Sequence, residues 1–194
     1  MKANTDVVRR FASELEKLGA TCTLLGTNAE VVEHISDFVR KKGARLVLAC
    51  GLERALSHEI SKAISSVNAS YFDVNELNGR DLREFLKRAD IGITGADLAV
   101  AETGSLVITS KNDAERLVSC LPPVHVVILS KEKILDNFLE ITEWLRKVQD
   151  RSTRTVSIIT GPSRTADIEL EIVVGVHGPH ELHVIILGGM SNEG

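Results

Sequence analysis

The stretch Ala89–Ile108, ADIGITGADLAVAETGSLVI, places a polar loop between two apolar runs. The first run, which starts at Asp90, and the second, Ser105–Thr109, have the near-continuous apolar residues of buried strands. Residues that packing alone would not favour crowd into the loop between them: Thr94, Gly95, Asp97, Glu102 and Thr103. Because loops at strand ends carry binding and catalytic groups in α/β proteins, we expect the function of the chain to lie here.

A second polar region follows the apolar run Val156–Ile159. It contains the segments GPSRTADIE, Gly161–Glu169, and GVHGP, Gly175–Pro179. Both segments combine hydroxyl, carboxylate or imidazole groups with glycine and proline, which interrupt regular structure. We predict that these segments meet the loop of Ala89–Ile108 in one pocket.

Helical and strand patterns alternate along the whole chain. The spacing of apolar residues predicts these helices, of which the last is the longest: Thr5–Leu18, a helix capped by Asn28 and ending at Gly43, Glu53–Ser66, a short helix from Asn78, a short helix with the capping residues Asn112 and Glu115, and Ser130–Val148. Apolar runs predict these strands: Ala20–Leu25, Arg45–Cys50, Ala69–Val74, one from Asp90, Ser105–Thr109, Val124–Leu129, Thr155–Thr160 and His183–Leu187. The segment Asp167–Ile172 fits either a strand or a short helix. This alternation indicates an α/β fold with a mostly parallel sheet covered on both faces.

Length and composition restrict the classes of protein that fit. A chain of 194 residues is typical of one domain with a sizeable core. Within a single domain of residues 1–194, we expect residues 1–88 to act as scaffold, 89–187 to carry the functional groups and 188–194 to form a flexible tail. The net charge is −4 and basic residues are scattered among acidic ones, which argues against a nucleic-acid or anionic-membrane partner. No apolar run has the length of a membrane span.

The three cysteines, Cys22, Cys50 and Cys120, lie far apart in the sequence. Their spacings do not match a zinc site, a redox dithiol or an iron–sulfur ligand set. The odd number of cysteines and the charged start of the chain favour the cytoplasm. We therefore expect neither a metal nor a cofactor bound by this chain.

Glu102 is the candidate catalytic residue. In an apolar cleft the pKa of its carboxyl group would rise, and the group could act as a base or a nucleophile. The alternative is that its oxygens accept backbone N–H groups and hold a turn. Thr103 and Gly104 also allow two interpretations. Their backbone amides could donate to an anionic oxygen, or the two residues could simply form a tight turn.

The other polar candidates offer hydrogen bonds to a ligand. Asp97 and Asp167 can each accept from a substrate hydroxyl, although Asp97 can also cap the turn after Thr94. Ser163 and Thr165 offer hydroxyl groups at a predicted helix start, where the helix dipole favours an anion. The alternative is that one of the two residues is merely the N-cap of that helix.

The histidines differ in their predicted roles. His177, next to Gly178, stands on an irregular backbone and can donate or accept near neutral pH. His177, His180 and His183 have the spacing H-x-x-H-x-x-H, but a proline between them breaks the helical geometry that would gather the rings at a metal. We predict His180 and His183 at the surface and His125 as a core residue with its hydrogen bonds satisfied.

The second half of the chain resembles the LUD-domain family. The matching segments are Gly92–Thr94, Ala96–Asp97, Ala101–Gly104, Leu121–Pro122, Gly161–Ser163, Thr165–Glu169 and Gly175–Pro179. The resemblance implies a three-layer α/β/α architecture, similar to the fold of sugar-phosphate isomerases and CoA transferases.

The resemblance also implies a part in the oxidation of lactate to pyruvate, with the iron–sulfur clusters on partner proteins. The chain would bind a small carboxylate or organise the complex, through the candidates Thr94, Asp97, Glu102, Thr103, Gly104, Ser163, Thr165, Asp167, His177 and Gly178. One alternative is a stand-alone enzyme for acyl-CoA or sugar-phosphate substrates that uses Glu102 as nucleophile or base. Another is a non-catalytic adaptor whose polar loops form a protein interface.

Overall fold

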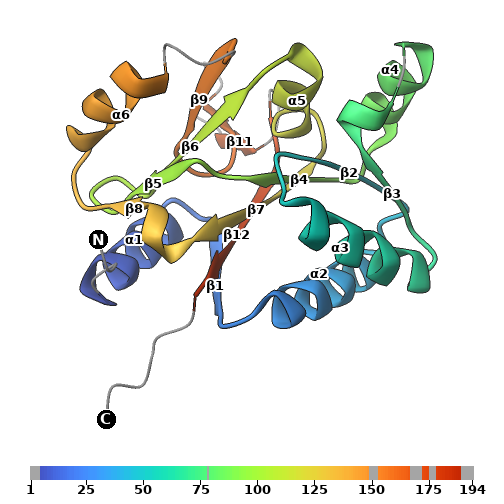
Figure 1. Cartoon of the computed structure of the whole chain (residues 1–194), viewed down its shortest axis with the longest axis horizontal. Coiled ribbons are helices and arrows are strands. Elements are labelled where there is room, and N and C mark those ends of the chain that lie inside the picture. The colour runs from blue at the N-terminus through green and yellow to red at the C-terminus, as the bar shows by residue number, and fades with distance from the viewer. Residues whose placement is uncertain (1–4, 78, 149–152, 167–171, 175–177, 189–194) are drawn as a thin grey trace.

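The computed structural model of the chain describes residues 5–77, 79–148, 153–166, 172–174 and 178–188 (Figure 1). The α-helices are α1 (Thr5–Lys17), α2 (Asn28–Lys42), α3 (Arg54–Ser66), α4 (Gly79–Arg88), α5 (Asp113–Val118) and α6 (Glu140–Val148), and the two 3-10 turns are η1 (Val74–Glu76) and η2 (Lys131–Lys133). Among these helices, none combines the length and the apolar character that crossing a bilayer requires.

Six parallel strands form the central sheet. They are β1 (Thr21–Leu25), β2 (Leu46–Cys50), β3 (Ser70–Asp73), β4 (Ile91–Gly95), β7 (Val124–Ser130) and β12 (Glu181–Leu187). Their spatial order is β1-β12-β7-β4-β2-β3, and every neighbouring pair is parallel. The predicted α/β fold with a mostly parallel sheet is confirmed.

A smaller sheet covers part of one face of the central sheet (Figure 1). Its order is β8 (Ile134–Leu135), β5 (Leu98–Val100), β6 (Ser105–Ser110) and β9 (Thr155–Ile159). β10 (Arg164–Ala166) and β11 (Ile172–Val174) form a separate antiparallel pair. The covering layer on this face therefore contains strands as well as helices, which the alternating pattern did not predict.

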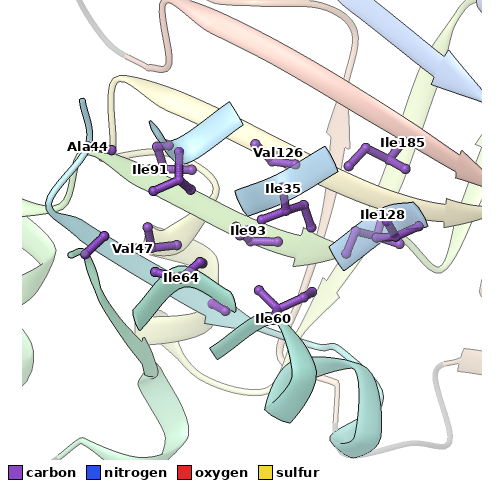
Figure 2. Packing of buried hydrophobic residues seen from close by; sticks show 14 of the residues in the cluster. Ile35, Ala44, Val47, Ile60, Ile64, Ile91, Ile93, Val126, Ile128 and Ile185 are labelled. Atoms are coloured by element: carbon purple, nitrogen blue, oxygen red, sulfur yellow. The ribbon is translucent and has the colours of Figure 1, made fainter. Parts of the chain in front are cut away.

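Helices α2 and α3 pack on the opposite face of the central sheet (Figure 2). Their inner side chains, Val31, Ile35, Val39, Leu56, Ile60 and Ile64, contact the strand residues Val47, Ile91, Ile93 and Val126. Successive strand residues point to opposite faces. Leu48 and Cys50 accordingly pack with α4 and α5, and Val127 and Leu129 pack with α1 and β6. Burial on both faces explains why these strands are almost entirely apolar.

The chain leaves β2 and β4 toward opposite faces of the sheet. β2 leads into α3, which lies on the same face as α2, whereas β4 leads into β5 of the smaller sheet. These two strands are neighbours in the central sheet. In open α/β sheets, such a divergence leaves a crevice outside the carboxyl ends of the strands, and ligands bind there.

The predicted helix Ser130–Val148 is wrong in its first half. The residues after β7 form η2 and β8, and α6 begins only at Glu140. Ile134 pairs with Ala99 of β5. Ile134 and Ile141 would share one stripe in a helix over Ser130–Val148, but in the structure they belong to different apolar clusters. Of the helices described, α2 is the longest, with 15 residues.

Thr27, and not Asn28, caps α2. The Thr27 hydroxyl accepts from the backbone N–H of Glu30, and the Glu30 carboxylate accepts in return from the backbone N–H of Thr27. This reciprocal capping box satisfies two N–H groups that have no partner inside the helix. The predicted cap of α5 is confirmed, because Asn112 Oδ1 accepts from Glu115 N–H at 2.9 Å.

Removing the side chain of Ile93 is expected to destabilise the protein strongly. Ile93 is fully buried between the central sheet and the layer of α2 and α3 (Figure 2). Ile93→Ala should lower the free energy of unfolding by about 2–5 kcal/mol, and the smaller change Ile93→Val by about 0.5–1.5 kcal/mol. Urea unfolding followed by circular dichroism measures both. A loss for Ile93→Ala no larger than that for Ile93→Val would contradict this packing.

Candidate functional site

A cavity of about 360 Å³ opens at the carboxyl ends of β2, β3 and β4. We call it the switch-point cavity, because it lies where the segments after β2 and β4 diverge. Residues 50–52 line it from the end of β2, and residues 94–97 line it from the end of β4. Its charged side chains are Asp73, Asp97, Lys111, Glu115 and Lys133. The predicted ligand residues Thr94 and Asp97 are both part of its wall.

Each carboxylate of the switch-point cavity accepts a backbone N–H group. The three pairs are Asp97 with Thr109 N at 2.7 Å, Glu115 with Lys111 N at 2.7 Å, and Asp73 with Asn75 N at 2.9 Å. One oxygen of each carboxylate is thus tied to a backbone N–H, which orients the second oxygen. Among the described residues, no group of three or more His, Cys, Asp or Glu side chains is placed to hold a metal ion.

Lys133 brings a positive charge to the loop after β4. Its Nζ donates to the carbonyl oxygen of Ala96 at 3.0 Å. An ammonium group has three N–H donors, so two remain for a ligand. Lys111, directly after β6, adds a second ammonium to the cavity wall. The sequence patterns did not identify either lysine as a candidate ligand residue. A lysine on a predicted amphipathic helix or directly after a strand is usually solvated.

A buried hydrogen bond connects this cavity to the interior. Thr94 Oγ1 and His125 Nε2 lie 2.9 Å apart, and both residues are 1% exposed. Burial lowers the pKa of His125 from its ordinary value of 6.5 to about 3, so the ring is neutral near pH 7. The prediction of a core histidine is correct as to burial, but Nδ1 has no hydrogen-bond partner in the part of the chain that the structure describes.

A second cavity, of about 420 Å³, lies beside the start of β7 and β12 and against β9. We call it the β9 cavity. Its wall includes His125 and the predicted ligand residues Ser163 and Gly178. Ser163 N–H donates to the Pro179 carbonyl oxygen at 3.0 Å. The two late polar segments therefore do meet each other, as predicted, but they meet at a different cavity from Thr94 and Asp97.

Glu102 lies in neither cavity wall. It is exposed, and its Oε2 accepts from the backbone N–H of Phe138 at 2.8 Å. Its own N–H donates to the Asp136 carbonyl oxygen at 3.0 Å. Both bonds fasten the turn before β6 to the segment between β8 and α6. This geometry corresponds to the turn-holding interpretation of Glu102.

Thr103 and Gly104 occupy the same turn in different ways. The Thr103 hydroxyl donates to Ser105 Oγ at 2.8 Å, and Ser105 Oγ lies 2.8 Å from Thr160 Oγ1, at the edge of the β9 cavity. Gly104 has φ +64°, and a Cβ at this position would lie 2.8 Å from the backbone nitrogen of Leu15 in α1. Only glycine fits so close to the helix, so Gly104 has a packing reason to be glycine.

Three predicted ligand residues cannot be assigned to either cavity. Asp167 and His177 lie outside the described residues, and the side chain of Thr165 is not described either. The backbone of Thr165 belongs to β10 and pairs with Val173, so the helix start predicted near Ser163 is wrong. The binding roles of all the candidates stay predictions.

His183 is buried, and its predicted surface position is wrong. It is 6% exposed, because β12 lies inside the sheet between β1 and β7. Its Nε2 lies 2.8 Å from His34 Nε2, and its ring stacks on Phe38. Burial lowers the pKa of His183 to about 4. His180, in contrast, is exposed as predicted.

Replacing His125 is expected to make the free energy of unfolding less dependent on pH in the acidic range. The folded protein keeps the ring neutral down to about pH 3, whereas the unfolded chain binds a proton below about pH 6.5. The free energy of unfolding should therefore fall as the pH drops from about 6.5 towards about 3, by roughly 1.4 kcal/mol per pH unit from this ring. His125→Gln removes that contribution, while His183 contributes equally in both proteins. Urea unfolding at several pH values compares the slopes, and equal slopes would mean that His125 titrates normally.

Comparisons with known proteins agree with this architecture. The lactate utilization protein C of Anoxybacillus flavithermus (strain DSM 21510 / WK1) is 30% identical over 179 residues, which cover 89% of this chain and 80% of the relative. The protein of the same name from Halalkalibacterium halodurans is 30% identical over 190 residues, covering 92% and 82%. A crystal structure of a DUF162 family protein from Deinococcus radiodurans has a TM-score of 0.64 at 19% identity, over 94% of this chain and 97% of that one, and thus shares the fold.

The LUD domain family matches residues 8–187. This range contains both sheets and all the described residues that line the two cavities. The chain therefore belongs to the LUD domain family.

Proposed function

We propose that this protein serves lactate utilisation in the cytoplasm, by taking part in the oxidation of lactate to pyruvate and binding a small carboxylate in the switch-point cavity. Relatives with 30% identity over most of the chain carry the name lactate utilization protein C, which supports the process. The position of the cavity supports the binding role, because open α/β sheets bind ligands at such a switch point.

The two lysines that share the cavity wall with Asp97 are the observation that carries the binding role. Lys133 is anchored to the Ala96 carbonyl oxygen, and Lys111 lines the same cavity. Ammonium groups donate charge-assisted hydrogen bonds to carboxylates, which are about twice as strong as bonds between neutral groups. A ligand carboxylate between the two lysines would also be close to the loop that follows β4.

Asp97 gives the cavity a means of telling lactate from pyruvate. Its Oδ2 is held by Thr109 N–H, so the carboxylate has a fixed orientation. The 2-hydroxyl group of lactate can donate to such a carboxylate, whereas the keto oxygen of pyruvate has no proton to donate. Two oxygens that both accept would repel each other. We therefore expect lactate to bind more tightly than pyruvate.

The oxidation removes two electrons and two protons from lactate. We assign the electrons to iron–sulfur partner proteins and the protons to the surrounding water. Thiolates are the ligands that such clusters need. In this chain, burial raises the pKa of Cys22 to about 12 and also raises that of Cys50, which disfavours the thiolate form. The part of this chain in the complex would then be to hold the substrate.

Lys133→Met is expected to weaken lactate binding. The change removes the charge and keeps a side chain of similar length, and loss of a charge-assisted hydrogen bond costs about 1.5–3 kcal/mol, or roughly 10-fold to 100-fold in Kd. Isothermal titration calorimetry with L-lactate measures the effect. Lys62→Met, which changes an exposed lysine of α3 outside the cavity wall, is the matched control. Equal lactate affinity in both variants would overturn the proposed site.

Glu102→Gln tests the alternative of a stand-alone enzyme. Because Glu102 holds the turn to Phe138 and lies outside both cavity walls, the variant should keep its lactate affinity within about 3-fold. It should lose about 1 kcal/mol of stability, since a neutral amide oxygen accepts more weakly than a carboxylate. Calorimetry and urea unfolding measure the two effects. If the wild-type protein turned over an acyl-CoA or a sugar phosphate unaided and folded Glu102→Gln did not, the alternative would be correct.

A further inference from the structure

We propose that the β9 cavity is a second binding site, which takes an uncharged molecule with a short apolar part and a hydrogen-bonding group, and that His125 recognises that group. This site does not depend on the function proposed for the switch-point cavity. It follows from the buried imidazole, from the chemistry of the cavity wall and from the size of the cavity.

His125 has one ring nitrogen without a partner among the described residues. Its Nε2 is engaged with Thr94, and Nδ1 is buried and has no hydrogen-bond partner in the described part of the chain. A buried polar atom without a partner costs roughly 1–3 kcal/mol. His125 nevertheless sits in β7, between Val124 and Val126, where an apolar residue would pack without this cost. A ligand that completed the hydrogen bond at Nδ1 would recover that cost, and such a residue is typical of a recognition site.

The wall of the β9 cavity carries no charged side chain among the described residues. Its apolar part includes Ile159, Pro162 and Leu182, and its polar part includes the hydroxyl groups of Ser157 and Ser163. The low pKa of His125 keeps its ring neutral as well. A charged ligand would lose its hydration here without gaining an opposite charge, so the wall favours an uncharged one.

The size of the cavity limits the ligand to a small molecule. At about 420 Å³ it falls in the lower part of the range of small-molecule pockets. His125 lines the cavity but is only 1% exposed, and Nδ1 is closed to solvent, so a ligand group reaches Nδ1 only when the ring or the side chains over it shift. The apolar part of the ligand would lie against Ile159, Pro162 and Leu182.

The hydrogen bond to Thr94 determines which group suits Nδ1. In a neutral imidazole one ring nitrogen donates and the other accepts. If Nε2 accepts from the Thr94 hydroxyl, Nδ1 carries the proton and needs an acceptor. If Nε2 donates to Thr94, Nδ1 is bare and needs a donor. A primary carboxamide offers both a donor and an acceptor, so isobutyramide, which adds a short branched apolar group, is a suitable probe for either tautomer.

Two substitutions of His125 separate its ring nitrogens. The amide nitrogen of glutamine can take the place of Nε2, so His125→Gln can keep the contact to Thr94 but has no polar atom at Nδ1. The amide of asparagine can take the place of Nδ1, so His125→Asn keeps a polar atom at the position of Nδ1 and loses the contact to Thr94. The pair therefore distinguishes a ligand contact at Nδ1 from a general effect of changing a buried residue.

The test is a titration of the wild-type chain with isobutyramide, followed by the ¹⁵N signals of its histidines. We expect the Nδ1 signal of His125 to shift with saturation, and the affinity to fall at least about 10-fold in His125→Gln but to stay within about 3-fold in His125→Asn. Lys133→Met, which alters the switch-point cavity, should bind isobutyramide as the wild type does. A crystal structure with only an ordered water on Nδ1, or equal affinity in His125→Gln, would overturn the site.

A second measurement covers the case in which a His125 variant fails to fold. Cys120 lines the β9 cavity and is half-buried. In the wild-type protein, isobutyramide should slow the alkylation of Cys120 by iodoacetamide in proportion to its occupancy of the cavity. An alkylation rate that did not change at any isobutyramide concentration tolerated by the folded protein would also overturn the proposal.

Discussion

Close backbone contact against β4 is the constraint on which both cavities depend. A Cβ at position 92 would lie 2.1 Å from the carbonyl oxygen of Val118, at the end of α5. A Cβ at position 95 would lie 2.4 Å from the carbonyl oxygen of Gly51, in the loop after β2. Real Cβ atoms essentially never approach another heavy atom within 3.0 Å, so both positions require glycine. The end of α5 and the loop after β2 can lie directly on β4 only because Gly92 and Gly95 have no side chains.

The close packing against β4 also determines the position of Thr94. It stands between the two glycines at the carboxyl end of β4, and it shares a face of the strand with Gly92. Because α5 covers that face closely, the threonine hydroxyl is buried and bonds to His125 of the next strand. Thr94 lines the switch-point cavity and His125 lines the β9 cavity. One hydrogen-bonded pair therefore stands between the two cavities, and its geometry depends on the glycines of β4.

Local patterns in the sequence predicted the parallel sheet and the position of Thr94 and Asp97, because both follow from one strand and the loop after it. They failed where two segments far apart in sequence decide the structure. Ile134 and Ile141 are seven residues apart, which fits two helical turns, but pairing with β5 draws Ile134 into a strand. Lys133 had the pattern of a solvated helix residue, and only the turn η2 brings its ammonium to the Ala96 carbonyl oxygen. The division of the predicted pocket into two cavities has the same origin, since no local pattern says which edge of the sheet a distant loop reaches.

If both cavities bind ligands, the pair of Thr94 and His125 offers a way to couple them by the position of a proton rather than by charge. A ligand in the switch-point cavity that accepted a hydrogen bond from the Thr94 hydroxyl would leave its oxygen as an acceptor toward His125. The ring would then have to donate from Nε2, and Nδ1 would carry no proton. A carboxylate is such an acceptor. Its binding would then favour a hydrogen-bond donor in the second cavity, although the two ligands never touch. Because the ring is buried and stays neutral, this coupling needs no charge in the interior of the protein, where a charge would cost far more than the reversal of one hydrogen bond.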